Sequence, residues 1–441
     1  MINRDTEKDA SIGFVSLGCP KATVDSELIV TELQRSGYQV GASDEASDVV
    51  VINTCGFIDA ARDESLEAIE EVVARGQQVI VTGCLGAERE LLKTKFPSLE
   101  FISGPADVGP VTDAVKKLLP QSHNDHHDLQ RVRLTPNHYA YLKISEGCNH
   151  TCSFCIIPSM RGKLRSRSVA DIVAEAEQAR DAGVKELLMV AQDLSAYGVD
   201  SKYQSLDSQG EAITADLYQL LLQLEGLVPW LRLHYVYPYP NVDRIVELIA
   251  RGVALPYLDI PLQHAEPRIL KAMRRPAAAE KTLERIQKWR ALCPDLAIRS
   301  TFIVGFPGET DEDVGVLLDF LEAAELDRVG VFTYSPVQGA SANELADHVD
   351  ERDKMDRQER VYEVQAEISR SRLERHIGKR LTVLVEEDGT VARSAYDAPE
   401  IDGQVLLDTP CDVGEFVVAE ITATDGHDLD GTVIGSQVTV R

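Results

Sequence analysis

The sequence predicts a mixed α/β protein made of an N-terminal parallel α/β domain, a central partial (β/α)6 barrel and a C-terminal small β-barrel. Three observations support this prediction. The chain has 441 residues, 44% of them hydrophobic, which is enough for about three domains with ordinary cores. Strand-like apolar runs alternate with helical patterns over most of its length, as in sheets covered by helices. From about Lys379 onwards, short strands follow one another without helices between them, which is typical of an all-β domain.

The N-terminal part of the chain shows the alternation of a parallel sheet with covering helices. Strands are predicted at residues 11–17, 49–53 and 78–82, because each is a short run rich in β-branched residues. An amphipathic helix is predicted from Asp59 to a stop at Gly76, since a capping residue precedes apolar side chains at helical spacing. The helix returns the chain to the next strand.

A cysteine follows each of these three strands: Cys19 in SLGC, Cys55 in NTC and Cys84 in TGC. Parallel strands in one sheet have their carboxyl ends at the same edge, which is where α/β sheets bind ligands. We therefore expect the three thiols, far apart in sequence, to converge in space.

A second alternating series begins at Tyr139, after an aperiodic polar stretch that we interpret as a linker over residues 121–133. Strands are predicted at residues 139–144, 185–191, 231–237, 257–261, 297–304 and 328–333, and helices at residues 169–182 and 216–224. Six such β/α units predict a partial barrel with its functional groups at the carboxyl ends of the strands. We expect the polar segment 199–211 to be a surface loop and a long helix over residues 352–375 to close the domain.

The last segment contains the strand-like runs LTVLVEE, GQVLLD, GEFVVAEITAT and GTVIGSQVTV, separated by Asp and Gly turns. Their number and spacing predict a small barrel. Residues 381–441 contain two basic residues, Arg393 and Arg441, against thirteen acidic ones. This domain is therefore poorly suited to bind phosphate backbones.

Composition narrows the functional classes further. The formal net charge is −27, which disfavours general nucleic-acid binding and favours basic partners. No apolar run approaches the 18 or so residues of a membrane span, and the N-terminus is charged. We therefore expect no membrane association and a cytoplasmic location. Eight cysteines are too few for a disulfide scaffold in a chain of this length, so the grouped thiols are candidate metal ligands.

The second group of thiols is the motif C-x3-C-x2-C, formed by Cys148, Cys152 and Cys155 just after the first barrel strand. Three thiolates can hold a [4Fe–4S] cluster and leave one iron open for another ligand. A zinc site would need a fourth protein ligand, and His150 is poorly placed for this inside the same tight loop. The cysteine spacing alone leaves a zinc site as an alternative. The position of the motif at the mouth of a β/α barrel favours the iron–sulfur cluster.

The motif GCNHTCSFCIIP, the six-unit barrel and the segment TFIVGFPGET resemble the radical S-adenosylmethionine superfamily. This resemblance implies that the open iron chelates the amino and carboxylate groups of S-adenosylmethionine. One electron then cleaves the sulfonium and gives a 5′-deoxyadenosyl radical, while the protein positions the cofactor and excludes water.

The segments SLGCPK, NTCGF and TGCLG narrow the resemblance to the methylthiotransferases. It implies a second [4Fe–4S] cluster, held by Cys19, Cys55 and Cys84, and a C-terminal barrel of the TRAM type. The implied domains are residues 10–120 for the auxiliary cluster, 134–371 for the radical core and 374–441 for the TRAM domain.

Further segments, among them SLGCPKATVDSE, AQDLSAYGVD, LHYVYPYP and YLDIPLQHA, resemble the branch of this family that modifies an aspartate of small-subunit ribosomal protein twelve. The implied product is 3-methylthioaspartate. The resemblance also implies a second S-adenosylmethionine as methyl source, sulfur handled at the auxiliary cluster, an electron donor, and the ribosomal protein or the ribosome as partner.

Two other functions compete with this one. A methylthiotransferase that modifies an adenosine of transfer RNA would have the same clusters, but its TRAM domain would need a basic RNA-binding surface. The acidity of residues 381–441 suits a basic ribosomal protein better, so we do not expect direct RNA binding to dominate. A non-catalytic, zinc-stapled ribosome adaptor is the alternative from another class.

The candidate contacts to S-adenosylmethionine are Phe154, Gln192, Asp193, Gly305 and Gly308. Phe154 lies inside the cluster loop, and the other four follow the second and fifth barrel strands, whose carboxyl ends face the expected pocket. Glycine would let the backbone approach the cofactor closely. Core packing for Phe154, and strand-ending turns for the others, are the plain alternatives.

Several further residues receive weaker interpretations. Arg161, Arg165 and Arg167 either pair with a carboxylate of the cosubstrate or of the target aspartate, or form a solvated basic stretch. We interpret His234 and His264 as structural residues of the barrel mouth, and Cys293 and Cys411 as packing residues.

Overall fold

The computed structural model describes residues 11–41, 47–120, 130–206, 210–275 and 281–436. It divides into two compact units. Unit 1 contains the described residues up to Pro136 together with Ile156–Lys163, and unit 2 contains Asn137–Cys155 and the described residues from Leu164 onwards. Residues 121–129 of the expected linker lie outside the described residues. Within the described part of the chain, no helix is both long and apolar enough to cross a membrane.

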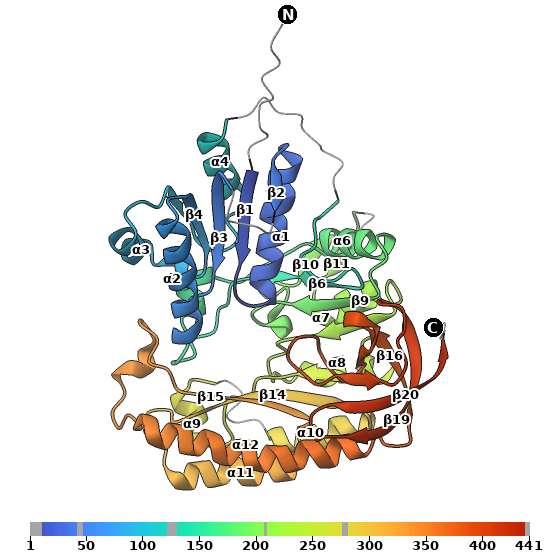
Figure 1. The fold of residues 1–441 in the computed structure, drawn as a ribbon. Coiled ribbons are helices and arrows are strands. Elements are labelled where there is room, and N and C mark those ends of the chain that lie inside the picture. Colours follow the sequence, from blue (N-terminus) through green and yellow to red (C-terminus); the bar gives the residue numbers. More distant parts are fainter. Residues whose placement is uncertain (1–10, 42–46, 121–129, 207–209, 276–280, 437–441) are drawn as a thin grey trace, which may run out of the picture. The chain divides into compact units, whose positions relative to one another are not determined.

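Unit 1 is built on a five-stranded parallel sheet in the order β2-β1-β3-β4-β5, of which Figure 1 labels β1 to β4. Its strands are β1 (Ser11–Ser16), β2 (Gln39–Gly41), β3 (Val49–Thr54), β4 (Gln78–Gly83) and β5 (Phe101–Ile102). Its larger helices are α1 (Pro20–Arg35), α2 (Asp59–Ala74), α3 (Arg89–Lys95) and α4 (Val108–Leu118). The three predicted strands and the predicted helix are all present, and β2 and β5 are additional short strands at the sheet edges.

Side-chain alternation along β3 explains the two helical layers. Val49 and Val51 pack with α1 and α4 on one face of the sheet, whereas Val50 and Ile52 pack with α2 and α3 on the other. Successive strand residues point to opposite faces, and every residue of β3 is buried. A continuous β-branched run is therefore the sequence of a central strand covered on both sides.

Unit 2 contains six parallel strands that follow one another in chain order, which confirms the predicted partial barrel. They form the sheets β12-β9-β6 and β13-β14-β15. Backbone hydrogen bonds from Val236 N to Asp259 O (2.8 Å) and from Leu255 N to Leu231 O (2.8 Å) join the two sheets. The strands are β6 (Tyr139–Lys143), β9 (Glu186–Val190), β12 (Trp230–Leu233), β13 (Tyr257–Asp259), β14 (Ala297–Val304) and β15 (Arg328–Thr333).

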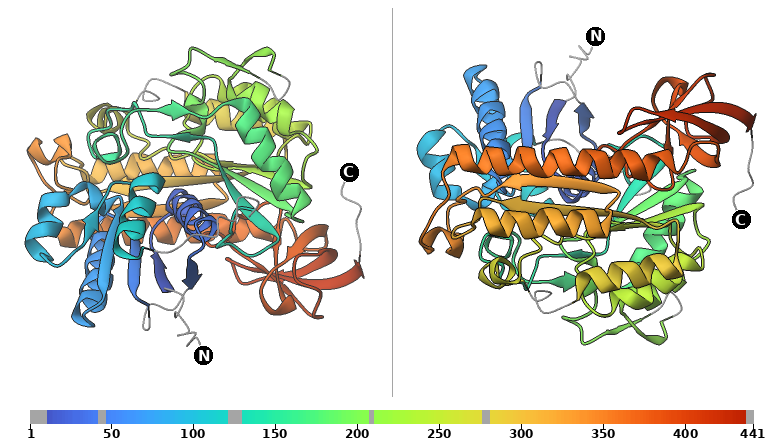
Figure 2. Two further views of the ribbon diagram at one scale, coloured as in Figure 1. Left: turned by 90° about the horizontal axis from the view of Figure 1, so that it is seen from above. Right: turned by 90° about the horizontal axis from the view of Figure 1, so that it is seen from below.

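Helices cover the outside of these strands. They are α6 (Val169–Asp181), α7 (Leu217–Leu224), α8 (Val242–Ala250), α9 (Pro267–Ala272), α10 (Thr282–Leu292), α11 (Asp311–Ala324) and α12 (Glu351–Glu374). Figure 2 shows the long α12 running beside α11, and Gln358 Nε2 of α12 donates to Val331 O of β15 at 2.7 Å. The predicted long helix thus closes the barrel domain.

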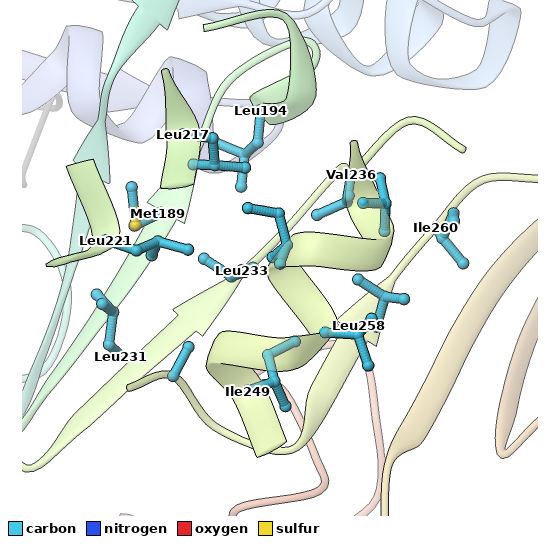
Figure 3. Close-up of a cluster of buried hydrophobic side chains, with 14 of the residues drawn as sticks. Met189, Leu194, Leu217, Leu221, Leu231, Leu233, Val236, Ile249, Leu258 and Ile260 are labelled. Atoms are coloured by element: carbon cyan, nitrogen blue, oxygen red, sulfur yellow. The ribbon is translucent and has the colours of Figure 1, made fainter. Parts of the chain in front are cut away.

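The barrel core lies between these strands and helices. Figure 3 shows Met189 of β9, Leu233 of β12 and Leu258 of β13 pointing towards Leu221 of α7 and Ile249 of α8. Each of these side chains is nearly or fully buried. This apolar packing holds the strand ends, and the loops after them, in fixed positions.

The segment 199–211 is not the simple surface loop that we expected. β10 (Gln204–Leu206) pairs antiparallel with β11 (Ala212–Thr214) in a hairpin; residues 207–209 lie outside the described residues. Ile213 packs against the barrel core, and Ser205 Oγ accepts from Val169 N at the start of α6 at 3.1 Å. Two strands of three residues each are too short to give a recognisable pattern in the sequence.

The C-terminal part of unit 2 is a closed barrel of five strands in the order β16-β17-β18-β20-β19. Its strands are β16 (Arg380–Val385), β17 (Val391–Ser394), β18 (Val405–Leu407), β19 (Phe416–Thr424) and β20 (Leu429–Ser436). Val383, Val405 and Val417 contribute to its own apolar core. The predicted small barrel is confirmed, with β17 as a strand that the sequence did not reveal.

Buried ion pairs join this terminal barrel to the central barrel within unit 2. Glu186 of β9 is bound by Arg232 and by Arg393 of β17, and all three side chains are buried. Arg328 of β15 binds Asp397 at 2.7 Å. Burial raises the pKa of the Glu186 carboxyl, but the two arginines outweigh it and hold the pKa below its usual value. The two barrels therefore share a charged, solvent-excluded contact.

Replacing Arg393 by methionine should strongly destabilise unit 2. The change leaves Glu186 with fewer partners in a buried site, and breaking a buried ion pair typically costs about 3–5 kcal/mol. The measurement is chemical denaturation of the variant. Arg380→Met is the matched control, because Arg380 has a side chain 71% exposed and lies 3.6 Å from Glu420; we expect a change within about 0.5 kcal/mol. Equal effects of the two substitutions would contradict this account.

Candidate active site

The first cysteine triplet lies at the carboxyl edge of the sheet in unit 1. Cys19 precedes α1, Cys55 follows β3, and Cys84 follows β4, and the three strands that lead to them are neighbours in the sheet. Gly18 has a φ of +105°, and a Cβ added there would lie 3.2 Å from Cys55 Cβ. The loop that carries Cys19 therefore lies directly against Cys55, as the topology predicted.

The thiols of this triplet influence one another electrostatically. Burial raises the pKa of Cys84 to about 11, although Arg161 opposes the shift, and charge on Cys19 or Cys55 raises it further. Burial also raises the pKa of Cys55. At Cys19 burial raises the pKa, but Lys21, backbone amides and Arg161 together bring it below its usual value. Charge on Cys19 also raises the pKa of Cys55, so the three thiols lie close to one another.

These residues fit an iron–sulfur cluster. The donors are thiols, which are the ligands that iron–sulfur clusters take, and Arg161 supplies positive charge beside them. Within the described residues, no three His, Cys, Asp or Glu side chains surround the position of a single metal ion. Cluster ligands instead surround a body of four irons and four sulfides.

The second triplet lies in unit 2, in the loop after β7 (Ser145–Glu146) at the carboxyl end of β6. Cys155 N donates to Cys152 O at 3.2 Å, and His150 N donates to Cys148 Sγ at 3.4 Å. Burial raises the pKa of Cys148 to about 11, and the His150 amide opposes this. The loop is anchored by Ser153, which donates to Met273 O and Ala272 O. A tight, anchored loop with three thiols also fits a cluster.

Aromatic and charged side chains surround this loop. His150 Nε2 lies 2.7 Å from Asp193 Oδ2, and its ring stacks on Tyr237 at 4.1 Å. Tyr237 Oη lies 3.6 Å from Cys152 Sγ, and burial raises the pKa of this phenol well above its usual value, so it stays protonated and can donate. Arg275 Nη1 lies 3.7 Å from the same sulfur. Cys152 thus receives two donors from the barrel mouth.

His150 itself is not arranged as a metal ligand. Its Nε2 contacts Asp193, and its Nδ1 lies 3.2 Å from Tyr239 Oη. Both ring nitrogens therefore have protein partners. The histidine holds the cysteine loop against the ends of β9 and β12.

The side chains that we expected to contact the cofactor also contact other parts of the protein. Phe154 packs against a cluster that includes Phe306. Gln192 Nε2 donates to Glu146 Oε1 at 3.0 Å. Asp193 is buried and accepts from Ser195 N at 2.8 Å as well as binding His150. The structure thus brings Asp193 next to the second triplet through His150, and each of these side chains also has a structural role.

The two glycines have structural reasons of their own. A Cβ at Gly305, which has a φ of +72°, would lie 2.3 Å from Lys354 Cγ, so only glycine fits against α12 there. Gly305 N donates to Glu309 Oε1 at 2.7 Å. Gly308 has a φ of +81°, which also favours glycine. Their contact with a cofactor remains a prediction.

A hollow of about 420 Å³ lies beside the second triplet within unit 2. Cys148, His150 and Asp193 line one part of it, and Tyr203 and Asn241 line another. Such a volume lies in the usual range for small-molecule sites. The segment 199–211 thus contributes to the wall of this hollow through Val199 and Tyr203, which precede β10.

Sequence reasoning missed several residues of these sites. Tyr237 and Tyr239 alternate in LHYVYPYP directly after β12, a pattern that could have marked them as facing the barrel mouth. Nothing in the local sequence marks Arg275. Arg161 is neither solvated nor free for the cosubstrate, because it is buried and paired with Asp25 in unit 1.

The remaining arginines, histidines and cysteines considered from the sequence lie away from the two cysteine triplets or have structural partners. Arg165 is exposed, whereas Arg167 pairs with Glu175 and donates to Lys143 O. His234 lies 3.4 Å from Asp259, and His264 lies 3.3 Å from Glu309. Cys293 is buried in the barrel core, and Cys411 is partly buried beside the core of the terminal barrel.

The fold and the two cysteine sites define a radical S-adenosylmethionine protein. Residues 142–321 match the Radical SAM superfamily, residues 11–104 match Uncharacterized protein family UPF0004, and residues 377–434 match the TRAM domain. A solved radical S-adenosylmethionine methyltransferase, TsrM from Kitasatospora setae, aligns with a TM-score of 0.53 over 74% of each chain at 14% identity. That likeness supports the fold.

Relatives with high sequence identity show the family to which this chain belongs. Proteins named ribosomal protein uS12 methylthiotransferase RimO from Azoarcus sp. (strain BH72) and Thiobacillus denitrificans are each 55% identical over 437 residues, covering 97% of this chain and 99% of theirs. The relative of that name from Rhodopseudomonas palustris (strain BisA53) is 53% identical over 432 residues, covering 96% and 98%. The chain therefore belongs to the RimO family of ribosomal protein uS12 methylthiotransferases.

Membership confirms the enzyme class predicted from the sequence. The chain is a transferase of the radical S-adenosylmethionine superfamily, with S-adenosylmethionine and [4Fe–4S] clusters as its cofactors. The zinc-stapled adaptor and the transfer RNA enzyme are the less well supported alternatives.

Proposed function

We propose that this chain adds a methylthio group to the β-carbon of an aspartate in ribosomal protein uS12, giving 3-methylthioaspartate. The relatives at 53–55% identity over nearly the full length are named uS12 methylthiotransferases, which supports uS12 as the substrate. The observation in this chain that carries the substrate choice is the charge of its terminal barrel. An electron donor is required, and the cytoplasm is the proposed location.

We assign the two triplets different tasks. Cys148, Cys152 and Cys155 hold the cluster that works with S-adenosylmethionine, and a separate set, Cys19, Cys55 and Cys84, holds the auxiliary cluster. When bound, the first cluster and its cosubstrate supply a 5′-deoxyadenosyl radical for hydrogen abstraction, and the second supplies a site for sulfur. The proposed cofactor contacts are Phe154, Gln192, Asp193, Gly305 and Gly308. The proposed domain bounds are 10–120, 134–371 and 374–441, with a linker at 121–133.

The chain's own residues orient this chemistry. His150, fixed by Asp193 and stacked on Tyr237, keeps the second cysteine loop in one position over the barrel. Tyr237 Oη and Arg275 Nη1 lie 3.6 Å and 3.7 Å from Cys152 Sγ, and these contacts hold the sulfur in position.

The terminal barrel presents an acidic surface. Eight acidic side chains of residues 381–435 are exposed: Glu387, Asp388, Glu400, Asp408, Asp412, Glu415, Asp425 and Asp430. Between residues 381 and 435 there is no lysine, and the single arginine, Arg393, is 1% exposed. Arg380, the first residue of β16, is the exposed arginine of this barrel and lies 3.6 Å from Glu420. Such a surface repels phosphate backbones and attracts a basic protein.

Glu386 and Asp402 count towards the thirteen acidic residues of 381–441 but do not belong to this exposed surface. Asp402 has a side chain only 1% exposed, and it binds Arg299 and the Tyr257 hydroxyl. Glu386 is mostly buried and binds Arg393 at 2.9 Å. Net charge counts every acid equally, whereas these two attach the terminal barrel or stabilise its interior.

Charge reversal of the exposed acids should weaken uS12 binding. The variant carries lysine at Glu387, Asp412, Glu415 and Asp430; Asp388 is left intact because its carboxylate accepts from Thr390 N. We expect the dissociation constant for uS12 to rise at least about tenfold, since each exposed charge pair contributes up to about 1 kcal/mol. Binding of the native protein should also weaken with salt, because exposed charges are screened beyond about 10 Å at 0.1 M.

The matched control reverses four exposed acids on α2, namely Glu64, Glu67, Glu70 and Glu71, and should bind uS12 as the native protein does. Equal loss in both variants would show that only net charge matters. Unchanged uS12 binding in the first variant, or tight salt-sensitive binding of transfer RNA by the native protein, would favour the transfer RNA alternative.

A further inference from the structure

Arg161 lies at the first cysteine triplet. It is the last residue of α5 (Ile157–Arg161), which is followed by Gly162 with a φ of +75°. The segment Ile156–Lys163 comes directly after Cys155 in the chain but packs within unit 1. The side chain of Arg161 is 2% exposed. A cation carried by the end of one cysteine loop is thus buried in the unit that holds the other triplet.

The guanidinium of Arg161 contacts both a cysteine sulfur and a carboxylate. Its Nε donates to Cys84 Sγ at 3.3 Å, and its Nη1 donates to Asp25 Oδ2 at 3.2 Å. Asp25 belongs to α1, the helix that begins directly after Cys19, and its side chain is also 2% exposed. The carboxylate therefore fixes the direction in which the guanidinium points.

The other two cysteines lie close to the sulfur that Arg161 contacts. Cys84 N donates to Thr54 O, the residue before Cys55, at 2.9 Å. A Cβ added at Gly18, the residue before Cys19, would lie 3.6 Å from Cys55 Sγ. The guanidinium at Cys84 therefore lies beside the edge of the sheet that carries all three cysteines.

We propose that Arg161 is a positioning residue of the cluster held by Cys19, Cys55 and Cys84, and that its charge, oriented by Asp25, raises the reduction potential of that cluster. The proposal rests on the assignment of this triplet to an auxiliary cluster. The potential of an iron–sulfur cluster depends on net charge and on hydrogen bonds to its sulfurs. A buried cation beside a ligand sulfur stabilises the more negative, reduced state.

A purely structural role is the competing explanation. A buried Arg–Asp pair can attach the segment Ile156–Lys163 to α1 without any effect on a cluster. Such a role predicts losses of stability and iron content when either partner is changed, always in the same direction. An electrostatic role predicts opposite shifts of the potential, because Arg161 and Asp25 carry opposite charges.

The test uses the full chain with Cys148, Cys152 and Cys155 all replaced by alanine, so that only the first triplet can load iron. Midpoint potentials are measured by redox titration followed by electron paramagnetic resonance. In this background, Arg161→Gln should lower the ratio of reduced to oxidised cluster at a fixed potential about tenfold. This corresponds to a midpoint potential that is lower by about 59 mV for a one-electron step. Asp25→Asn should shift the potential in the positive direction, and Arg161→Lys should keep most of the native value.

The outcomes separate the possibilities. Opposite shifts for Arg161→Gln and Asp25→Asn, with rescue by lysine, support the proposal. Unchanged potentials in variants that have merely lost iron or stability overturn it. If Arg161→Gln loads no iron, the direction of the Asp25→Asn shift decides. A background variant that binds no cluster at all contradicts the ligand assignment, and the proposal falls with it.

Discussion

Replacing Cys152 by alanine should abolish the formation of 5′-deoxyadenosine from S-adenosylmethionine. Cys152 is the central thiol of the second triplet and the one that both Tyr237 and Arg275 approach. Two remaining thiolates cannot hold a cluster that needs three protein ligands. The measurement is chromatography of the nucleoside products after anaerobic reconstitution and chemical reduction, with iron content expected to fall from about eight to about four per chain.

The control for this variant is Cys411→Ala. Cys411 is partly buried in the terminal barrel and has no cysteine near it in sequence. It should retain both the iron content and the cleavage activity of the native protein. Cleavage at the native rate by the Cys152 variant would show that the second triplet does not bind the reactive cluster.

Replacing Cys55 by alanine should stop methylthio transfer while leaving cleavage of S-adenosylmethionine at least partly intact. Cys55 follows the central strand β3 in unit 1, and the residues around Cys152 belong to unit 2. Loss of one cluster should therefore leave the other formed. Both products are measured in one reaction: 5′-deoxyadenosine by chromatography and modified uS12 by mass spectrometry.

This comparison separates the two tasks. Normal modification of uS12 by the Cys55 variant would contradict the sulfur role of the first triplet. Loss of both reactions would show that the two clusters depend on each other for assembly. We expect the Cys55 variant to cleave S-adenosylmethionine without forming methylthiolated uS12.

The sequence could predict the strands that carry the first triplet because their patterns are long and regular. The continuous apolar run of β3 indicates a central strand covered on both faces, and a parallel sheet brings the ends of its strands to one edge. The convergence of Cys19, Cys55 and Cys84 follows from these two facts alone. The short β2, β5 and β17 could not be predicted, since two to four residues give no periodicity.

The charged residues were harder to interpret, because their roles depend on partners far away in sequence. Arg161 is 136 positions from Asp25, and Arg393 is 207 positions from Glu186. A local pattern shows a charge but not whether a buried counterion neutralises it. For the same reason the net charge of residues 381–441 includes Asp402, although its side chain is buried against Arg299.

The most direct test of the central claim is mass spectrometry of ribosomal protein uS12 incubated with the reconstituted enzyme, S-adenosylmethionine, a sulfur source and a reductant. Transfer RNA is included in the same reaction as a competing substrate. The account predicts a mass increase on one aspartate of uS12 equal to one methylthio group in place of one hydrogen, with transfer RNA unchanged. Unmodified uS12 together with methylthiolated transfer RNA would contradict it.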